Sequence, residues 1–155
     1  MKKGRGGRQS PFVRTANRLG PVEHSILRIA MSKELMDIVL PRLAQRLNRQ
    51  LRRYRAGEMD DAQFSRKFES LLQQQYSWLA KQGIPEVEAA VAVHGAVLVL
   101  SGPGLRAEAA EQAMPLEVIE YQAICAAAGD IAEHYGVSEQ RATRRLATIV
   151  AYYAE

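Results

Sequence analysis

Apolar residues recur at helical spacing along most of the chain, and this pattern predicts an all-α fold. The clearest series lies between residues 40 and 55, where apolar side chains fall on one side of a helix: Leu40, Leu43, Leu47, Leu51 and Tyr54. The short link after this series contains Gly57, which permits a left-handed helix end. A second series follows and is terminated by Gly83, Ile84 and Pro85; its apolar residues are Phe64, Phe68, Leu71, Leu72 and Leu79. Two long amphipathic helices with so short a connection favour an antiparallel αα-hairpin.

Proline and capping residues suggest where the helices of the first half begin. Pro21 suits a helical first turn, and Ser32 is a candidate cap for a new segment. Pro41 lacks a backbone donor, so we expect a kink or a fresh helix start just before it. Asp60 or Asp61 is placed to cap the next helix with an acid at the positive end of its dipole.

Residues 89–100 form an apolar run that periodicity alone does not assign. The run fits a buried helix that starts at Pro85, or a β-hairpin that turns at His94 and Gly95. We favour the helix, because an isolated hairpin is only marginally stable and no other strand is evident. The segment Ser101–Gly104 ends the element in either case.

The C-terminal third contains a further apolar helical series between Pro115 and Gly136, which Gly129 is able to divide into two helices. This series is followed by a glycine suited to a left-handed turn and then by a second helix with a serine at its N-cap. The features that matter are a small residue at a helix crossing, a turn glycine, an apolar residue beneath the turn, a serine cap and two core positions: Ala132, Gly136, Val137, Ser138, Ala142 and Leu146. On these features, about residues 117–150 resemble the helix-turn-helix element of bacterial DNA-binding regulators.

The resemblance implies a DNA interface on the second helix of this pair. In that family the early residues of the second helix enter the major groove, where glutamine pairs with adenine edges and arginine with guanine edges. The corresponding residues here are Ser138, Glu139, Gln140, Arg141, Thr143, Arg144 and Arg145. Because such elements bind paired half-sites, the resemblance also implies a homodimer.

Positive charge is concentrated in the first third of the chain, although the net charge of the whole is only +4. Residues 1–55 carry 14 Lys or Arg against 3 acids, whereas residues 56–155 carry 7 against 14. This asymmetry favours a polyanionic partner for the basic part. The alternative is that the basic third neutralises the acidic remainder, within one chain or between chains.

Two parts of the basic third are candidates for phosphate contacts. Residues 1–20 are basic and glycine-rich without acids, which predicts a flexible arm whose arginines include Arg5, Arg8 and Arg14. In the 40–55 helix, arginines form a second stripe about half a turn from the leucines, with no acids between them: Arg42, Arg46, Arg49 and Arg53. Guanidinium groups pair bidentately with phosphate oxygens, so this stripe fits a phosphate-tracking surface as well as a solvated helix face.

The sequence offers little for catalysis, metals or membranes. The three histidines lack metal-ligand spacing, no nucleophile or phosphate-loop motif occurs, and Cys125 fits a buried small hydrophobe better than a nucleophile. No apolar run approaches the ~20 residues of a spanning helix, and the charged N-terminal residues do not fit a signal peptide. We therefore expect no catalytic residues, no cofactor, no metal and no membrane, and a soluble cytoplasmic location.

Together these patterns predict an all-α protein in three parts. They are a flexible basic arm (1–20), a helical hairpin region (21–84), and a central apolar helix with a helix-turn-helix-like pair (85–155) that forms one compact domain with the hairpin. The leading hypothesis is a small non-enzymatic protein that binds nucleic acid and acts in transcription regulation, with DNA favoured and RNA possible. The alternative is a structural or accessory subunit of a larger nucleoprotein or protein assembly.

Overall fold

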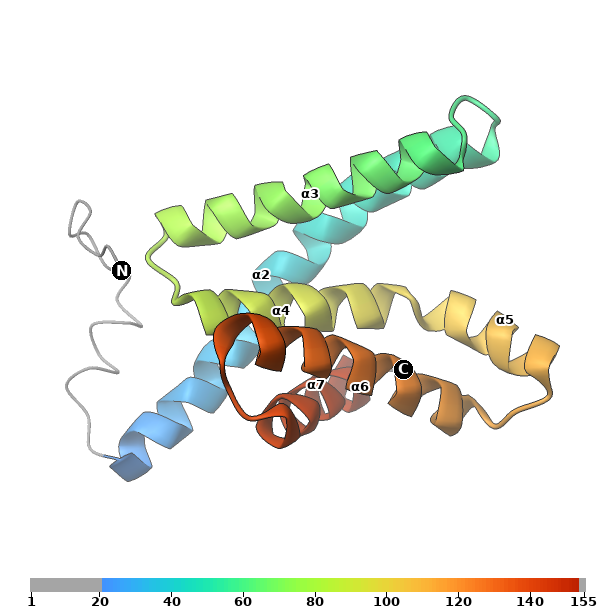
Figure 1. Cartoon of the computed structure of the whole chain (residues 1–155). Coiled ribbons are helices and arrows are strands. Elements are labelled where there is room, and N and C mark those ends of the chain that lie inside the picture. The colour runs from blue at the N-terminus through green and yellow to red at the C-terminus, as the bar shows by residue number, and fades with distance from the viewer. Residues whose placement is uncertain (1–20, 154–155) are drawn as a thin grey trace. The chain divides into compact units, whose positions relative to one another are not determined.

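The computed structural model describes residues 21–153, with side chains from residue 33 onward, and every regular element in that range is helical (Figure 1). In chain order the helices are α2 Pro21–Arg55, α3 Asp61–Lys81, α4 Glu86–Leu100, α5 Gly102–Gln112, α6 Leu116–Tyr135 and α7 Glu139–Tyr153. The predicted all-α class is confirmed, and residues 89–100 are helical rather than a β-hairpin. The predicted arm, with Arg5, Arg8 and Arg14, lies outside the described residues.

Two compact units make up the chain. The first ends at Ala89 and the second begins at Ala90, so their boundary falls within α4. In the first unit α2 packs against α3, and in the second unit α5 and α7 both pack against α6. The two candidate nucleic-acid surfaces therefore belong to different units, the arginines of α2 to the first and the early residues of α7 to the second.

Helix α2 is a single element of 35 residues, so no new helix starts at Ser32 or near Pro41. The kink that was the other expectation at Pro41 stays a prediction. A serine inside a helix costs only a few tenths of a kcal/mol relative to alanine, so Ser32 does not interrupt the backbone. Pro41 removes one backbone donor, at a cost of about 3 kcal/mol. Its ring is exposed, and the core residues Val39 and Leu43 on either side of it are fully buried, so their packing favours continuation of the helix.

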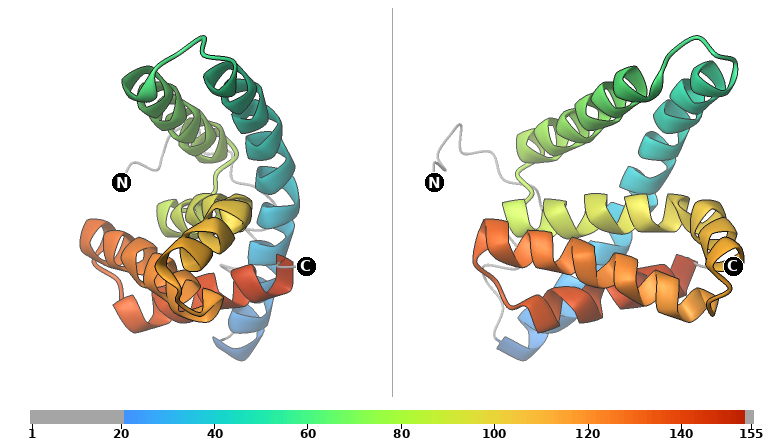
Figure 2. Two further views of the ribbon diagram at one scale, coloured as in Figure 1. Left: turned by 90° about the vertical axis from the view of Figure 1, so that its right-hand side faces the viewer. Right: turned by 45° about the vertical axis from the view of Figure 1, so that its right-hand side comes forward.

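The second half of α2 lies beside α3, and the chain changes direction in the loop between them (Figures 1 and 2). Leu43 and Leu79 are fully buried, and the Tyr54 and Phe64 rings lie in tilted contact with centroids 5.0 Å apart. The Tyr54 hydroxyl donates to the Asp61 carboxylate, which raises the pKa of Tyr54. This hydrogen bond is thus present at neutral pH and is lost as the pH rises through that raised pKa.

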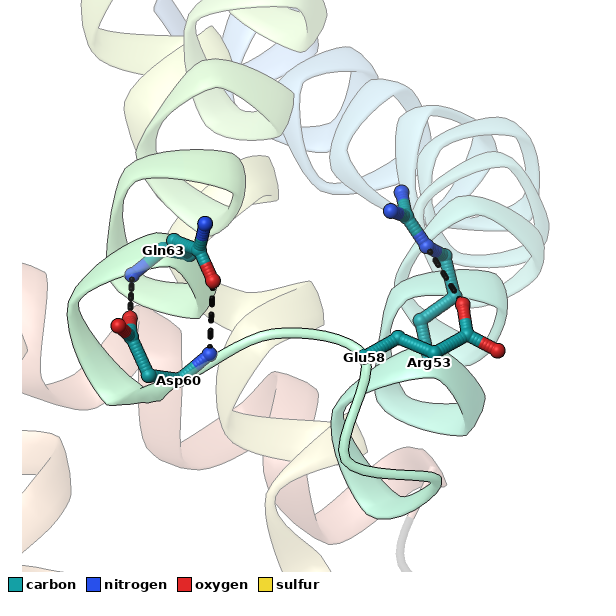
Figure 3. Close-up of polar contacts among 4 residues, drawn as sticks. All are labelled: Arg53, Glu58, Asp60 and Gln63. Atoms are coloured by element: carbon teal, nitrogen blue, oxygen red, sulfur yellow. Dashed lines mark hydrogen bonds and ion pairs between the residues drawn. The ribbon is translucent and has the colours of Figure 1, made fainter.

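The loop before α3 follows the predicted turn chemistry. Gly57 has a positive φ of 77°, and Asp60 is the N-cap of α3. The Asp60 carboxylate accepts from the Gln63 backbone N–H at 2.8 Å, and the Gln63 side chain accepts from the Asp60 N–H at 2.9 Å (Figure 3). This reciprocal pair is a capping box, which satisfies two of the backbone donors at the helix start.

Replacing Asp60 by alanine should lower the free energy of unfolding by about 1 kcal/mol, because the Gln63 amide loses its acceptor. Urea denaturation followed by circular dichroism measures this loss. Ser65→Ala, at an exposed position inside the same helix, is the matched control and should leave stability unchanged or slightly higher. Equal stabilities for the two variants would contradict a stabilising role for the capping box.

Helix α5 was not predicted. The segment Ser101–Gly104 does end α4, but a new helix begins at once at Gly102, with Pro103 in its first turn. Proline is preorganised for that position, whereas the two flanking glycines have poor helix propensity and mask the signal. The axes of α4 and α5 differ by 56°. No single helix between residues 21 and 153 is long and apolar enough to cross a membrane, although this bent pair reaches that length and composition when its two helices are combined.

Helix α6 runs without interruption through Gly129, so the predicted division there does not occur. Its buried residues face those of α7, and the core of the pair consists of Ile119, Ile124, Ala128, Ile131, Ala142, Leu146 and Ile149. Ala142 and Leu146 therefore lie in the core as predicted. The apolar stripe of α7 leaves its opposite side available to solvent.

Candidate nucleic-acid interface

The turn between α6 and α7 determines how the second helix begins. Gly136 ends α6 with a φ of 67°, and its N–H donates to the Ala132 carbonyl at 2.8 Å. Ser138 then caps α7, because its hydroxyl oxygen accepts from the Arg141 backbone N–H at 3.2 Å. The predicted roles of Gly136 and Ser138 are confirmed, and the first turn of α7 has a defined backbone.

The start of α7 also passes close to α6. A side-chain carbon added at Gly129 would lie 3.8 Å from the Glu139 carboxylate, an ordinary contact distance. Glu139 therefore lies toward α6, although it remains exposed to solvent. Thr143 is half-buried, and its hydroxyl donates to the Glu139 carbonyl at 2.9 Å. The Thr143 hydroxyl is used within α7, and the Glu139 side chain lies near α6. These two predicted site residues are therefore less available for contact with a ligand than the sequence suggested.

Three predicted residues of α7 come together on its outer side. Gln140, Arg141 and Arg144 are exposed. At 100° per residue Gln140 and Arg144 lie opposite the buried positions Ala142 and Leu146, and Arg141 lies on the adjoining flank, about 100° from Ala142. Arg145 is half-buried, at the edge of the core stripe. The outer side of α7 thus presents an amide and two guanidinium groups within about two turns of a capped helix start.

The arginine stripe of α2 is less uniform than its sequence suggests. Arg46 is half-buried and Arg49 is exposed. Arg53 forms an ion pair with Glu58 from the following loop, at 3.3 Å (Figure 3). An acid from the following loop therefore neutralises the C-terminal end of the stripe, although no acid lies between its arginines. Sequence reasoning passed over two exposed arginines of the last turns, Arg52 and Arg55, because they fall outside the stripe.

Arg42 lies at the other end of the stripe, against α3. Its guanidinium carbon is 4.1 Å from the centroid of the Trp78 ring, a cation–π geometry, and its Nε is buried without a hydrogen-bond partner in the described part of the chain. Beside this pair is an open hollow of about 390 Å³ lined by Arg42, Ser70, Gln73, Gln74, Ser77, Trp78 and Lys81. The sequence signal for it was the polar series on α3, at i, i+3, i+4, i+7 and i+11 from Ser70, which was not used.

The histidine, cysteine and tyrosine side chains of the described residues make local contacts. Within residues 33–153, no three His, Cys, Asp or Glu residues lie close enough to hold a metal ion. Cys125 is half-buried rather than buried, and its hydrogen bond with the Tyr121 hydroxyl raises the pKa of Tyr121. His94 is also half-buried, with Nδ1 2.9 Å from the Ala90 carbonyl. These contacts all join residues one helical turn apart.

Comparison with known families, curated proteins and solved structures gave no match to this chain. The function is therefore inferred from the chemistry of its own surfaces. Of these, the outer side of α7 and the arginines of α2 carry the groups that best suit a polyanion.

Proposed function

We propose that this protein is a non-enzymatic nucleic-acid-binding protein that contacts duplex DNA through the first turns of α7. The observation that carries the proposal is the joint exposure of Gln140, Arg141 and Arg144 on a helix whose start is capped by Ser138. The Ser138 cap and the packing of the buried side of α7 fix the backbone conformation of the residues that carry these side chains. Their donors and acceptors are those that pair with base edges in the major groove.

Phosphate anchoring has to come largely from elsewhere in the chain. Asp130, Glu133 and Glu139 are exposed around the α6–α7 turn, and they reduce the positive potential there. Arg46, Arg49, Arg52 and Arg55 of α2 supply the phosphate contacts in our proposal, together with Arg5, Arg8 and Arg14 of the N-terminal segment. This division assigns base contacts to α7 and sequence-independent affinity to the basic first third. A role in transcription regulation, as a cytoplasmic homodimer on paired half-sites, follows from the same proposal.

A second candidate function has its own supporting observation. Val118 and Tyr121 on α6 and Tyr152 on α7 are exposed large side chains, with exposed fractions of 37%, 61% and 55%. Aromatic residues are enriched at protein interfaces. In this second proposal the protein is an accessory subunit of a nucleoprotein assembly, in which α6 and α7 contact protein and the basic third contacts RNA.

Binding across a salt series tests the two proposals against each other. Labelled duplex DNA, single-stranded DNA and structured RNA are titrated with the full chain and with a variant lacking residues 1–20. Duplex binding that persists near physiological salt in both proteins supports the α7 proposal, with log affinity falling linearly with log salt. A preference for RNA that disappears in the deletion variant favours the assembly proposal. No binding of any nucleic acid above low salt would rule out both.

A further inference from the structure

We propose that the hollow on α3 beside Arg42 binds the phosphodiester backbone of a single-stranded nucleic acid. This adds a second site to the proposed function, on the unit that ends at Ala89, whereas α7 belongs to the other unit. The lining residues are two cations, two serines, two glutamines and one tryptophan. No carboxylate is among them, so no negative charge on the walls repels a bound anion.

The length of the hollow suits a short stretch of a single strand. Its volume of about 390 Å³ is at the small end of the range for ligand pockets, and it is open to solvent along α3. The wall from Ser70 to Lys81 covers three helical turns, or about 16 Å, which corresponds to several nucleotides at ~3.4 Å each in a stacked strand. A single strand is flexible enough to follow this open wall over its whole length.

Arg42 is the group best prepared to bind phosphate here. Its guanidinium lies against the Trp78 ring, which restricts the side chain before any ligand arrives. Less conformational entropy is then lost on binding, because part of the ordering has already occurred. A stacked guanidinium still directs its in-plane donors outward, and two of them pair with two phosphate oxygens.

The remaining walls match the rest of a nucleotide strand. Lys81 supplies a second cation at the far end of the wall, suited to a neighbouring phosphate as a point charge. Ser70, Ser77, Gln73 and Gln74 are exposed, and their hydroxyl and amide groups suit sugar hydroxyls and base edges. Single-stranded RNA and single-stranded DNA share the phosphodiester backbone. A preference for RNA would indicate that these neutral side chains form hydrogen bonds with the ribose 2′-hydroxyl.

The only tryptophan of the chain makes the proposal directly testable. Because Trp78 lines the hollow, its fluorescence responds directly to a ligand bound at this site. Unlabelled 12-nucleotide RNA and DNA single strands are titrated into the full chain, and the emission of Trp78 is followed. The proposal predicts a saturable change in emission, with the same midpoint as the anisotropy of a labelled strand.

Charge-removing variants then separate this site from general electrostatic attraction. Arg42→Gln/Lys81→Gln should weaken single-strand binding about tenfold, and removal of two phosphate contacts should reduce the salt slope by about 1.4. The matched control Arg66→Gln/Arg106→Gln removes two exposed cations outside the hollow and should change affinity less than threefold. Lys81→Gln alone leaves the Arg42–Trp78 contact intact, so it tests the site even where the double variant is less stable. Its expected effect is about threefold, with a slope change of about 0.7.

Failure of this inference is distinguishable from failure of the α7 proposal. An unchanged Trp78 emission, or equal losses in the hollow and control variants, would overturn the hollow site, whatever happens with duplex DNA. If Arg141→Ala/Arg144→Ala leaves duplex binding intact while the hollow variants lose single-strand binding, the hollow stands and the α7 proposal fails. An emission change with an acidic peptide but not with either strand would also overturn it.

Discussion

Replacing Arg141 and Arg144 together by alanine is expected to weaken duplex DNA binding by about 2 kcal/mol or more, a loss of roughly 30-fold. Both side chains are exposed on α7, outside the buried stripe of Ala142 and Leu146. Their removal therefore takes away base and phosphate contacts without opening a cavity. Fluorescence anisotropy of a labelled duplex near physiological salt measures the loss.

A single-cation control on another helix makes that result specific. Arg106 is exposed on α5 in the same unit, so Arg106→Ala removes a cation without touching α7. Its expected effect on duplex affinity is below about twofold, as for a distant surface charge screened by salt. Circular dichroism of the double variant should match that of the parent protein. Equal, small losses in the Arg141/Arg144 and Arg106 variants would show that α7 is not the DNA-binding element.

The second large effect is on stability. Leu146→Ala is expected to lower the free energy of unfolding by about 2–5 kcal/mol, because it leaves a cavity in a closely packed core. Leu146 has no exposed surface, and with the equally buried Ile131 it belongs to the apolar contact between α6 and α7. Urea denaturation, followed by the loss of helical circular dichroism, gives the change.

Val118→Ala provides the comparison for this cavity. Val118 is also aliphatic, but 37% of it is exposed on α6, so the substitution should cost less than about 1 kcal/mol. In the α7 proposal, Leu146→Ala also weakens duplex binding as α7 loses its support, although residue 146 contacts no DNA. A Leu146→Ala protein as stable as Val118→Ala would contradict the packing of α7 described above.

Local chemistry explains why much of the fold was predictable from the sequence. Gly57 and Gly136 adopt positive φ, and Asp60 and Ser138 cap helices, as their residue types and positions suggested. Each of these signals acts within a few residues and needs no tertiary partner. The helical prediction for residues 89–100 was correct for a different reason. No other strand was evident in the sequence, and an isolated β-hairpin is only marginally stable.

The predictions that were wrong or missing concern features that depend on residues distant in the sequence or on competing local signals. Helix α2 continues through Pro41 because buried residues on both sides favour the helix, and this packing is not visible in a window around the proline. Helix α5 was missed because two glycines mask the proline in its first turn. The contacts of Arg42 with Trp78 and of Arg53 with Glu58 required the fold of α2, its loop and α3 to be known. The role of α7 in DNA binding stays a prediction that the fold alone does not test.

The most direct test of the central claim is nuclear magnetic resonance mapping of the backbone amides during titration with a duplex. The ¹⁵N-labelled full chain is titrated near physiological salt, first with a random-sequence 20-base-pair duplex. We predict that the largest shifts cluster at residues 138–145, with a second group on the last turns of α2. Shifts confined to α2, or spread evenly with none on α7, would contradict the claim that α7 is the DNA-binding helix.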